Sequence, residues 1–422
     1  MATASIREPA RDLPVRHEAD VLVVGGGSAG VAAAVAAARQ GADVLLAERH
    51  GHLGGLATGG LIILLLTLDD GRGRQVVAGL CEEVTRRLVR RGAAHHPPPE
   101  EWGSEAAERV ARDQRWGLVW GRPPHRVRYS VAYDPAYLKG VLDELVVESG
   151  ARLLLHAWGA EPLLADGRIE ALAFQSKAGR FAVRARRVID ATGDLDVAVG
   201  AGCAHATERV LPWMWFTVGG VDLARAGPDA PGFQTIGAGK VLLPWGSIEK
   251  VGWIDATVPE DLTHAEVECR RRVLAEFERL RREAPGFEQA HLCEVATQLG
   301  ITESRRLVGR HTLARSEMDA VRDDAVAATG HWTKYGATYD IPYDALLPRE
   351  VPNLLAAGRC ISVDHQVHHA TKEIPACMAT GEAAGVAAAL SLDRDVDPAE
   401  VPVKELRARL EAAGAIVSAG PR

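Results

Sequence analysis

Three glycines near the amino end of the chain have the spacing of a phosphate-binding turn. Gly25, Gly27 and Gly30 form a G-x-G-x-x-G pattern between the apolar run Val21–Val24 and the alanine- and valine-rich segment Val31–Arg39. Such a pattern is typical of a buried strand that turns tightly into a helix, where the backbone approaches a pyrophosphate and free helix N–H groups point at it. The alternative is an ordinary glycine-rich turn in an α/β domain.

The residues that follow favour a dinucleotide site. Asp43–Ala47 is predicted to form a second strand, and Glu48 stands at its end, where an acid accepts hydrogen bonds from the ribose hydroxyls of adenosine. The order of strand, glycine turn, helix, strand and acid fits within one βαβ unit. We therefore interpret the glycine turn as part of a dinucleotide site.

A second glycine-rich stretch, Gly51–Gly60, begins three residues after Glu48 and runs into the apolar segment Leu61–Leu66. Small residues allow the backbone to pass close to a flat, extended ligand. A mobile surface loop is the alternative, and we favour the ligand because the stretch directly follows the ribose acid. The residues expected at the ligand are Gly54 and Gly55 at the pyrophosphate, and Ala57 and Thr58 nearer the reactive ring.

Two further segments are suited to complete an extended site. Residues 190–194, Asp-Ala-Thr-Gly-Asp, end a predicted strand with small side chains, and ligands bind at the carboxyl ends of strands in such folds. Near the carboxyl end of the chain, Pro375 opens a predicted alanine-rich helix, Pro375–Leu390. The positive dipole end of this helix could stabilise a negative charge on a bound ring.

The elements that position these residues follow from periodicity and turn signals. Asp134 and Pro135 predict a helix to Glu148, and Thr263 with Glu266 forms a capping box for a long charged helix to Arg282. Val76–Arg91 predicts an amphipathic helix. Short strands are predicted at Arg152–His156, Arg168–Phe174 and Phe181–Ile189, which we interpret as a β-meander attached to the nucleotide-binding sheet.

We expect an α/β fold, with a Rossmann-like dinucleotide-binding domain that contains a parallel sheet and the β-meander, and an inserted α+β cap or substrate domain. The predicted boundaries are residues 19–68, 130–210 and 340–395 for the first domain, residues 69–129 and 211–339 for the second, and a disordered lead-in at residues 1–18.

Composition excludes several classes of function. The 422 residues are 47% hydrophobic and 25% charged, with a net charge of −7, which predicts a globular protein without general affinity for nucleic acid. The longest aliphatic run, Leu61–Leu66, is far shorter than a membrane span. The six cysteines include no C-x-x-C pair, so no zinc site, iron–sulfur centre or other metal is expected. No export signal is visible, and we expect a cytoplasmic protein.

Together these motifs resemble one family. The order VVGGGSAG, Glu48, GGLATGG, DATGD, TESRRLVGR and NLLAAGRCIS…PACMATGEAAGVAAA is similar to that of FAD-dependent oxidoreductases of the glutathione-reductase-like flavoprotein superfamily. Within it, the chain most resembles the subgroup akin to the fumarate reductase and aspartate oxidase flavoproteins. The resemblance covers residues 19–392 and implies FAD, bound covalently or non-covalently in an extended form.

The resemblance also implies which residues contact FAD. These are Gly25, Gly27, Ser28, Ala29 and Gly30 at the pyrophosphate, Glu48 at the adenosine ribose with Arg49 beside it, Gly54, Gly55, Ala57 and Thr58 towards the flavin, Ala191, Thr192 and Gly193 near the adenosine half, Gly358 and Arg359 at the ribityl chain, and Pro375, Ala376 and Cys377 at the flavin pyrimidine edge.

One segment departs from the fumarate reductases. Their His-Gly-x-x-Arg segment near the flavin is replaced by VDHQVHHATKE, so fumarate chemistry is not expected. Our hypothesis is that a substrate C–H or N–H bond is oxidised by hydride transfer to the flavin. The candidates for the base that takes the accompanying proton are His365, His368 and His369, because imidazole titrates near neutrality; each could instead hydrogen-bond backbone.

Arginines offer a second set of chemical groups. Arg305, with Arg306 and Arg310 nearby in sequence, could orient an anionic substrate through bidentate hydrogen bonds, or the three could form structural ion pairs. The sequence leaves both interpretations open.

The reoxidation of the flavin is also open. Only one G-x-G-x-x-G pattern is present, which argues against a separate NAD(P)H domain and leaves dioxygen, a quinone or a partner protein as electron acceptor. We predict a dehydrogenase or oxidase for a small organic molecule. The alternatives are a flavin monooxygenase or halogenase, and a flavin-binding electron-transfer subunit. The sequence is compatible with a homo-oligomer.

Overall fold

Parallel strands form the centre of the molecule, which is known from a computed structural model that describes residues 5–420. Their order is β6, β2, β1, β9 and β18, all parallel to their neighbours. The strands are β1 (Val15–Val24), β2 (Val44–Ala47), β6 (Arg152–Leu154), β9 (Gly179–Asp190) and β18 (Leu354–Ala356).

The apolar run that precedes the glycine turn is buried on both faces, as its composition predicted. Val21 and Val23 belong to the large core beneath the helices, whereas Leu22 and Val24 belong to a second core on the other face of the sheet. β1 begins at Val15 and pairs with β9 from there. The expected lead-in at residues 1–18 is therefore wrong for residues 15–18, and its residues 1–4 lie outside the described part of the chain.

The meander differs from the prediction. It consists of β7 (Trp158–Ala165) and β8 (Arg168–Ser176), which are antiparallel to each other, and of the amino half of β9, which is antiparallel to β8. The predicted strand after Gly150 is β6, which instead extends the parallel sheet beside β2. β7 was missed because it is an edge strand with mostly exposed side chains, so it lacks an apolar pattern.

Two helices pack backbone to backbone over the sheet. α1 (Ser28–Arg39) lies against α9 (Ile374–Asp393). A Cβ added at Gly381 would lie 2.1 Å from the carbonyl oxygen of Ala29, and one at Gly385 would lie 2.2 Å from that of Ala33. Only glycine allows this approach. α9 is long and apolar enough to cross a membrane, but 89% of the apolar window is buried, as in the core helix of a folded domain.

Further helices cover the same face. α4 (Pro135–Glu148) has the predicted bounds, and Asp134 caps it by accepting hydrogen bonds from the N–H groups of Ala136 at 2.9 Å and Tyr137 at 3.2 Å. α2 (Gly79–Arg90) packs against α4 and α9. A small sheet adjoins them, formed by β3 (Leu64–Leu65), β5 (Val131–Tyr133) and β4 (Ala94–His95).

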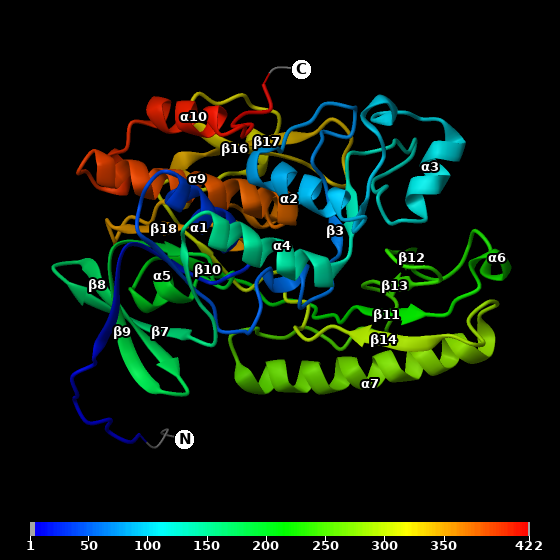
Figure 1. The fold of residues 1–422 in the computed structure, drawn as a ribbon, viewed down its shortest axis with the longest axis horizontal. Coiled ribbons are helices and arrows are strands. Elements are labelled where there is room, and N and C mark those ends of the chain that lie inside the picture. Colours follow the sequence, from blue (N-terminus) through cyan, green and yellow to red (C-terminus); the bar gives the residue numbers. More distant parts are fainter. Residues whose placement is uncertain (1–4, 421–422) are drawn as a thin grey trace.

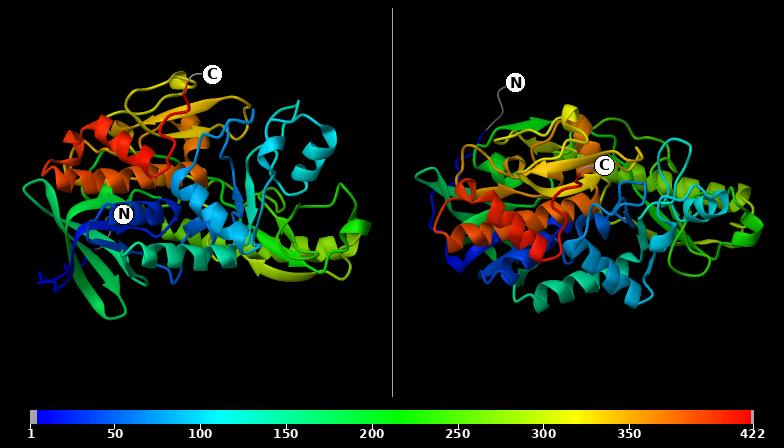
Figure 2. Two further views of the ribbon diagram at one scale, coloured as in Figure 1. Left: turned by 45° about the horizontal axis from the view of Figure 1, so that its top comes forward. Right: turned by 90° about the horizontal axis from the view of Figure 1, so that it is seen from above.

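A four-stranded antiparallel sheet and one long helix form the cap, which lies to one side of α1 and α9 in every view (Figures 1 and 2). The helix α7 (Pro259–Glu283) begins four residues before the predicted capping box, because Pro259 occupies its first turn; Thr263 instead donates a hydrogen bond to the Pro259 carbonyl at 2.7 Å. The strands are β11 (Phe216–Gly219), β12 (Phe233–Gln234), β13 (Val241–Leu243) and β14 (His291–Val295).

The remaining elements complete the fold. The hairpin of β16 (Ala325–Gly330) and β17 (Thr338–Pro342) packs on α9 and α10 (Val403–Ala412) through β16, although its residues fall in the predicted cap segment. The domain boundaries stay a prediction. The other elements are α3 (Ala107–Gln114), α5 (Asp196–Gly200), α6 (Leu223–Ala226), α8 (His365–Thr371), and the paired strands β10 (His205–Thr207) and β15 (Arg305–Leu307).

Candidate active site

A cavity of about 580 Å³ opens at the carboxyl ends of the parallel strands. Its lining includes Val24 and Ala47, the last residues of β1 and β2, and Ala191, which follows β9. It also includes Ser28 at the start of α1 and Cys377 in the first turn of α9. This volume is within the range of cofactor and ligand pockets. We call it the carboxyl-end cavity.

The glycine turn forms an anion-binding cradle in this cavity. Gly25 has a φ of +100°, and a Cβ at Gly30 would lie 1.8 Å from the Gly25 carbonyl oxygen, so the turn is tight. Gly27 precedes α1, and no side chain caps the helix there. A Cβ at Gly27 would meet no protein atom within 4 Å. The first-turn N–H groups of α1 are thus free to bind an anion such as a phosphate.

Glu48 lies beside the glycine turn, as the spacing predicted. Its carboxylate accepts hydrogen bonds from the N–H groups of Gly26 at 2.6 Å and His50 at 2.7 Å, and the residue is 7% exposed. The next residue, Arg49, places its guanidinium 5.5 Å from the ring centre of Trp158, and both residues line the cavity. Trp158 was not predicted. It could have been suspected as a large aromatic residue next to a sheet edge.

Arg359 joins three segments around the cavity. Its guanidinium donates hydrogen bonds to the Asp194 carboxylate at 2.8 Å and to the Ile301 carbonyl at 2.6 Å. The Arg359 carbonyl accepts a hydrogen bond from His368 Nε2 at 3.0 Å. The residues after β9, the segment before β15 and the turn after β18 are held together by this one side chain.

Most residues predicted to bind the cofactor line the cavity, and five lie behind its wall. Thr58 is fully buried and donates a hydrogen bond to the Leu53 carbonyl at 2.6 Å, while Gly30 and Gly358 pack against the backbone or side chains of the glycine turn. Pro375 and Ala376 are buried within α9. The predicted residues in the lining are Gly25, Gly27, Ser28, Ala29, Glu48, Arg49, Gly54, Gly55, Ala57, Ala191, Thr192, Gly193, Arg359 and Cys377.

The three histidines considered as the base do not line the cavity. They lie on α8, a helix that was not predicted and that Asp364 caps through the Val367 N–H at 2.7 Å. His365 is exposed and hydrogen-bonds Glu303 at 2.9 Å. His368 is buried, and this burial holds its pKa well below the usual value. His369 contributes its carbonyl to the Trp332 indole N–H at 2.7 Å.

The arginines form ion pairs. Arg305 lines the cavity, pairs with Asp196 and donates to the Asp194 carbonyl at 2.8 Å. Burial, with nearby carboxylates, raises the pKa of Asp196 to about 6. Arg306 is buried between Glu303 and Glu208, and Arg310 lies 3.7 Å from Asp344. Of the two interpretations, the structure shows the ion pairs.

One group of residues in the described part of the chain has the geometry of a metal site. Ligand atoms of Glu208, Glu303 and His365 lie within 4.8 Å of one another. Arg306 already bridges the two carboxylates, at 2.9 Å from Glu303 and 3.2 Å from Glu208. Its positive charge occupies the position that a cation would need.

Two charged residues of the cavity were missed. Lys372 and Glu373 line it immediately before α9. Burial raises the pKa of Glu373 to about 7. Both belong to the stretch VDHQVHHATKE, from which we chose the histidines as candidates for the base. The sequence signal for Lys372 and Glu373 was a charged pair directly before a proline-initiated helix with a small apolar face.

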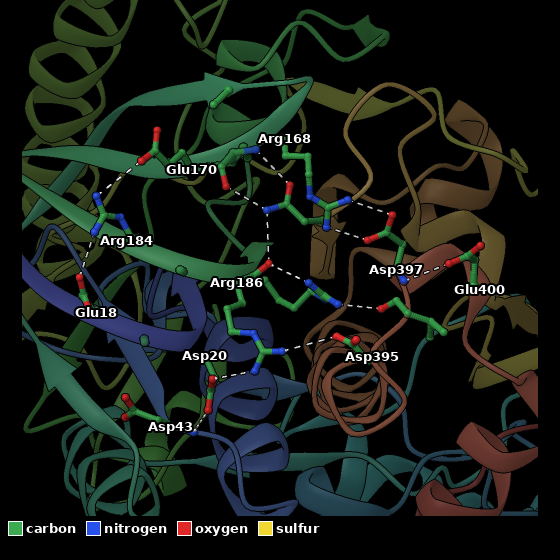
Figure 3. A pocket seen from close by; sticks show the side chains of 17 residues that line it. Glu18, Asp20, Asp43, Arg168, Glu170, Arg184, Arg186, Asp395, Asp397 and Glu400 are labelled. Atoms are coloured by element: carbon green, nitrogen blue, oxygen red, sulfur yellow. Dashed lines mark hydrogen bonds and ion pairs between the residues drawn. The ribbon is translucent and has the colours of Figure 1, made fainter.

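A larger groove lies at the opposite, amino ends of the parallel strands (Figure 3). Its volume is about 820 Å³, and we call it the amino-end groove. Arg168 pairs with Asp397 at 2.6 Å, Arg184 with Glu18 at 3.1 Å, and Arg186 with Asp20 at 3.4 Å. Its charged residues are Glu18, Asp20, Asp43, Arg168, Glu170, Arg184, Arg186, Arg187, Asp395, Asp397 and Glu400.

Comparison with known proteins identifies one matching family. The family described as FAD dependent oxidoreductase matches residues 20–211 and 207–410. Among curated proteins, digeranylgeranylglycerophospholipid reductase 1 of Methanopyrus kandleri is 29% identical over 183 residues. That match covers 42% of this chain and 40% of the relative, so it spans less than half of the relative's length.

One matched solved structure shows the same fold, and a second is less similar. A geranylgeranyl bacteriochlorophyll reductase-like protein from Thermoplasma acidophilum has a TM-score of 0.50 at 14% identity, over 94% of this chain and 83% of that one. p-Nitrophenol 4-monooxygenase from Pseudomonas putida DLL-E4 has a TM-score of 0.48 at 14% identity, over 93% and 84% of the two chains. At these identities the likeness concerns the fold alone.

Proposed function

The chain belongs to the FAD-dependent oxidoreductase family, and from this premise we propose that it is a dehydrogenase or oxidase that takes a hydride from a small organic substrate. One observation carries the proposal: a single cavity joins the glycine turn at α1 to the first turn of α9. When bound, FAD supplies a two-electron acceptor for the oxidation of a substrate C–H or N–H bond.

The lining residues fit an extended FAD. The uncapped first turn of α1 and the open space at Gly27 suit a pyrophosphate. Glu48 still has lone pairs for the adenosine ribose, since each of its carboxylate oxygens accepts one backbone N–H. Arg49 and Trp158 offer flat surfaces for the adenine. The first turn of α9 would lie at the flavin.

The protein groups at the α9 end favour substrate oxidation. The amino end of this 20-residue helix carries a partial positive charge, which stabilises negative charge nearby. Leu56, Ile62 and Ile374 line the cavity with apolar surface and limit the access of water. Arg359 holds the surrounding segments in place. His368 of α8 supports this arrangement outside the cavity, through its hydrogen bond to the Arg359 carbonyl.

The lining also bears on the size of the substrate. Two of the matched proteins are named for reactions on long prenyl chains. In this chain the α9 end of the cavity carries the charged side chains of Lys372 and Glu373 beside Ile62 and Ile374. A mixed lining of this kind favours a small polar molecule over a long hydrocarbon.

The test begins with the purified protein. We expect it to be yellow, or to become yellow on addition of FAD, and an anaerobic screen of small metabolites should find a compound that bleaches it. Peroxide formation in air without an external reductant then supports an oxidase. A requirement for such a reductant supports a monooxygenase or halogenase instead. A protein that stays colourless with added FAD would contradict the proposal.

A further inference from the structure

Two charged side chains at the amino end of α9 face the carboxyl-end cavity without a partner. Both Lys372 and Glu373 line it. Within residues 5–420 neither side chain forms a hydrogen bond or an ion pair, and they do not pair with each other. Both residues are partly exposed, and a ligand that fills the cavity would remove their charged groups from water, so these groups would then need compensating partners. Here the compensation is left to whatever binds in the cavity.

The packing of the helices places this pair beyond the pyrophosphate cradle. Gly381 lies against Ala29 and Gly385 against Ala33, so α1 and α9 run in the same direction. Glu373 precedes Gly381 along α9, and eight residues of helix span about 12 Å. The charged pair therefore lies about 12 Å beyond the amino end of α1, on the side away from the body of that helix.

The other residues that line the cavity suit a small ligand. Leu56, Ile62 and Ile374 provide apolar walls, and Gln298 adds a neutral polar group. The FAD phosphates have their own site at α1, so Lys372 is available for a different anion. Glu373 stands next to it and accepts a hydrogen bond or a proton from a neighbouring group of the same ligand.

We propose that Lys372 and Glu373 form the substrate-binding end of the cavity and that the substrate is a small organic acid with an amino or hydroxyl group beside its carboxylate. Lys372 Nζ binds the carboxylate, and a carboxyl oxygen of Glu373 binds the amino or hydroxyl group. This inference rests on the proposed oxidoreductase function.

The protonation of Glu373 agrees with this role. Burial raises the pKa of its carboxyl to about 7, so near neutrality the group can both accept and release a proton. It is thus placed to take the proton that an amino or hydroxyl group releases when the adjacent carbon is oxidised. None of the three histidines of α8 lines the cavity, and Glu373 supplies the acid–base group that they were expected to supply.

The test uses the FAD-loaded protein and measures ligand binding through changes in flavin absorbance at pH 8. The probes are butyrate, its amide butyramide, and 2-aminobutyrate. The variants are Lys372→Met and Glu373→Gln, with Lys404→Met and Glu411→Gln on the exposed face of α10 as matched controls. FAD content and FAD dissociation constants are measured for every protein, so loss of the cofactor is distinguished from loss of the ligand.

The wild-type protein should bind 2-aminobutyrate more tightly than butyrate, and butyrate more tightly than butyramide. Lys372→Met should weaken binding of both acids about tenfold or more, as for loss of a charge-assisted hydrogen bond, and leave butyramide unchanged. Glu373→Gln should not weaken the binding of butyrate, because it removes a negative charge, and it should remove the preference for 2-aminobutyrate. The controls should behave as wild type.

Three results overturn the inference. The first is equal binding of the acids by wild type and Lys372→Met. The second is a loss of FAD affinity in Lys372→Met, which makes the lysine a cofactor ligand. The third is a flavin-loaded wild-type protein that responds to neither acid. Absence of FAD from the wild-type protein would instead refute the proposed function on which the inference rests.

Discussion

Two cavities lie at opposite ends of the same parallel strands and differ in how their charged side chains are paired. In the amino-end groove, Arg168, Arg184, Arg186 and Arg187 each have a protein partner (Figure 3). In the carboxyl-end cavity, neither Lys372 nor Glu373 has a hydrogen-bond or ion-pair partner among residues 5–420. The groove is the larger, at about 820 against about 580 Å³. The volume of a cavity therefore does not identify the candidate active site. Unpaired charged groups in a cavity lined by glycines are the better indication.

The difference has a physical cause in the sheet. At the carboxyl ends of the strands the chain turns into helices, so uncapped helix N–H groups and small residues collect there. At the amino ends, long arginine and carboxylate side chains meet on an open surface. Exposed pairs of this kind contribute only about 0–1 kcal/mol each, and each of the four arginines already has a protein partner.

The largest expected effect comes from filling the cradle of the carboxyl-end cavity. Gly27→Glu should reduce FAD affinity by about a hundredfold or more, because its carboxylate enters the space of the pyrophosphate and repels it. The fold should survive, since a Cβ at Gly27 meets no protein atom within 4 Å. FAD titration followed by fluorescence measures the loss, and circular dichroism checks the fold. An unchanged FAD affinity of the variant would contradict the assignment of this turn to the pyrophosphate.

A buried carboxyl outside both cavities tests the cost of an uncompensated charge. Glu382 is 3% exposed and accepts the Leu80 N–H at 3.0 Å, and burial raises its pKa from 4.5 to about 7. The folded state then binds more protons than the unfolded state between these values. The free energy of unfolding should therefore fall by about 3 kcal/mol as the pH rises from about 4.5 to 7.

Glu382→Gln should remove most of this pH dependence, because the amide stays neutral and its oxygen can still accept the Leu80 N–H. Urea denaturation at several pH values between 4.5 and 8 compares the two proteins. An equal fall in stability with pH in both proteins would assign the effect to other groups.

A smaller effect is expected at the ribose acid. Glu48→Gln should weaken FAD binding about tenfold, because an amide oxygen replaces a carboxylate that serves both the Gly26 and His50 N–H groups and the ribose. The FAD dissociation constant of the variant measures this. The comparison with adenosine diphosphate, which shares the ribose and lacks the flavin, should show the same factor if Glu48 acts at the adenosine half.

The smallest effect is expected in the amino-end groove. Arg184→Gln removes an exposed guanidinium from Glu18 and Glu170 and should change the free energy of unfolding by less than about 0.5 kcal/mol. FAD affinity should not change. A large effect on ligand binding or on turnover would contradict the contrast between the two cavities and make the groove a site.

The sequence predicted the glycine turn and Glu48 of the carboxyl-end cavity because their arrangement depends on local backbone geometry. The spacing of Gly25, Gly27 and Gly30 and the position of Glu48 encode a turn, and a turn is local. Asp134 and Pro135 likewise predicted α4 with its observed bounds. Such local patterns can be interpreted without knowing which distant segments of the chain contact one another.

The end of the cavity at α9 was not predictable in the same way. His365, His368 and His369 have suitable chemistry, but α8 folds as a capped helix whose backbone contacts Arg359 and Trp332 and not the cavity. Lys372 and Glu373 are ordinary surface residues by type. Only tertiary packing, which fixes where α9 begins relative to α1, reveals that they enter the cavity.

The glycine contacts between α1 and α9 also limit how this site can change over evolution. Since Gly381 and Gly385 rest on the backbone of α1, the two helices cannot slide by less than a whole turn without a steric clash. The contacts between the helices thus fix the distance between the glycine turn and the charged pair Lys372–Glu373. Substitutions at Lys372 and Glu373 can then change the groups that face a ligand without changing their distance from the glycine turn.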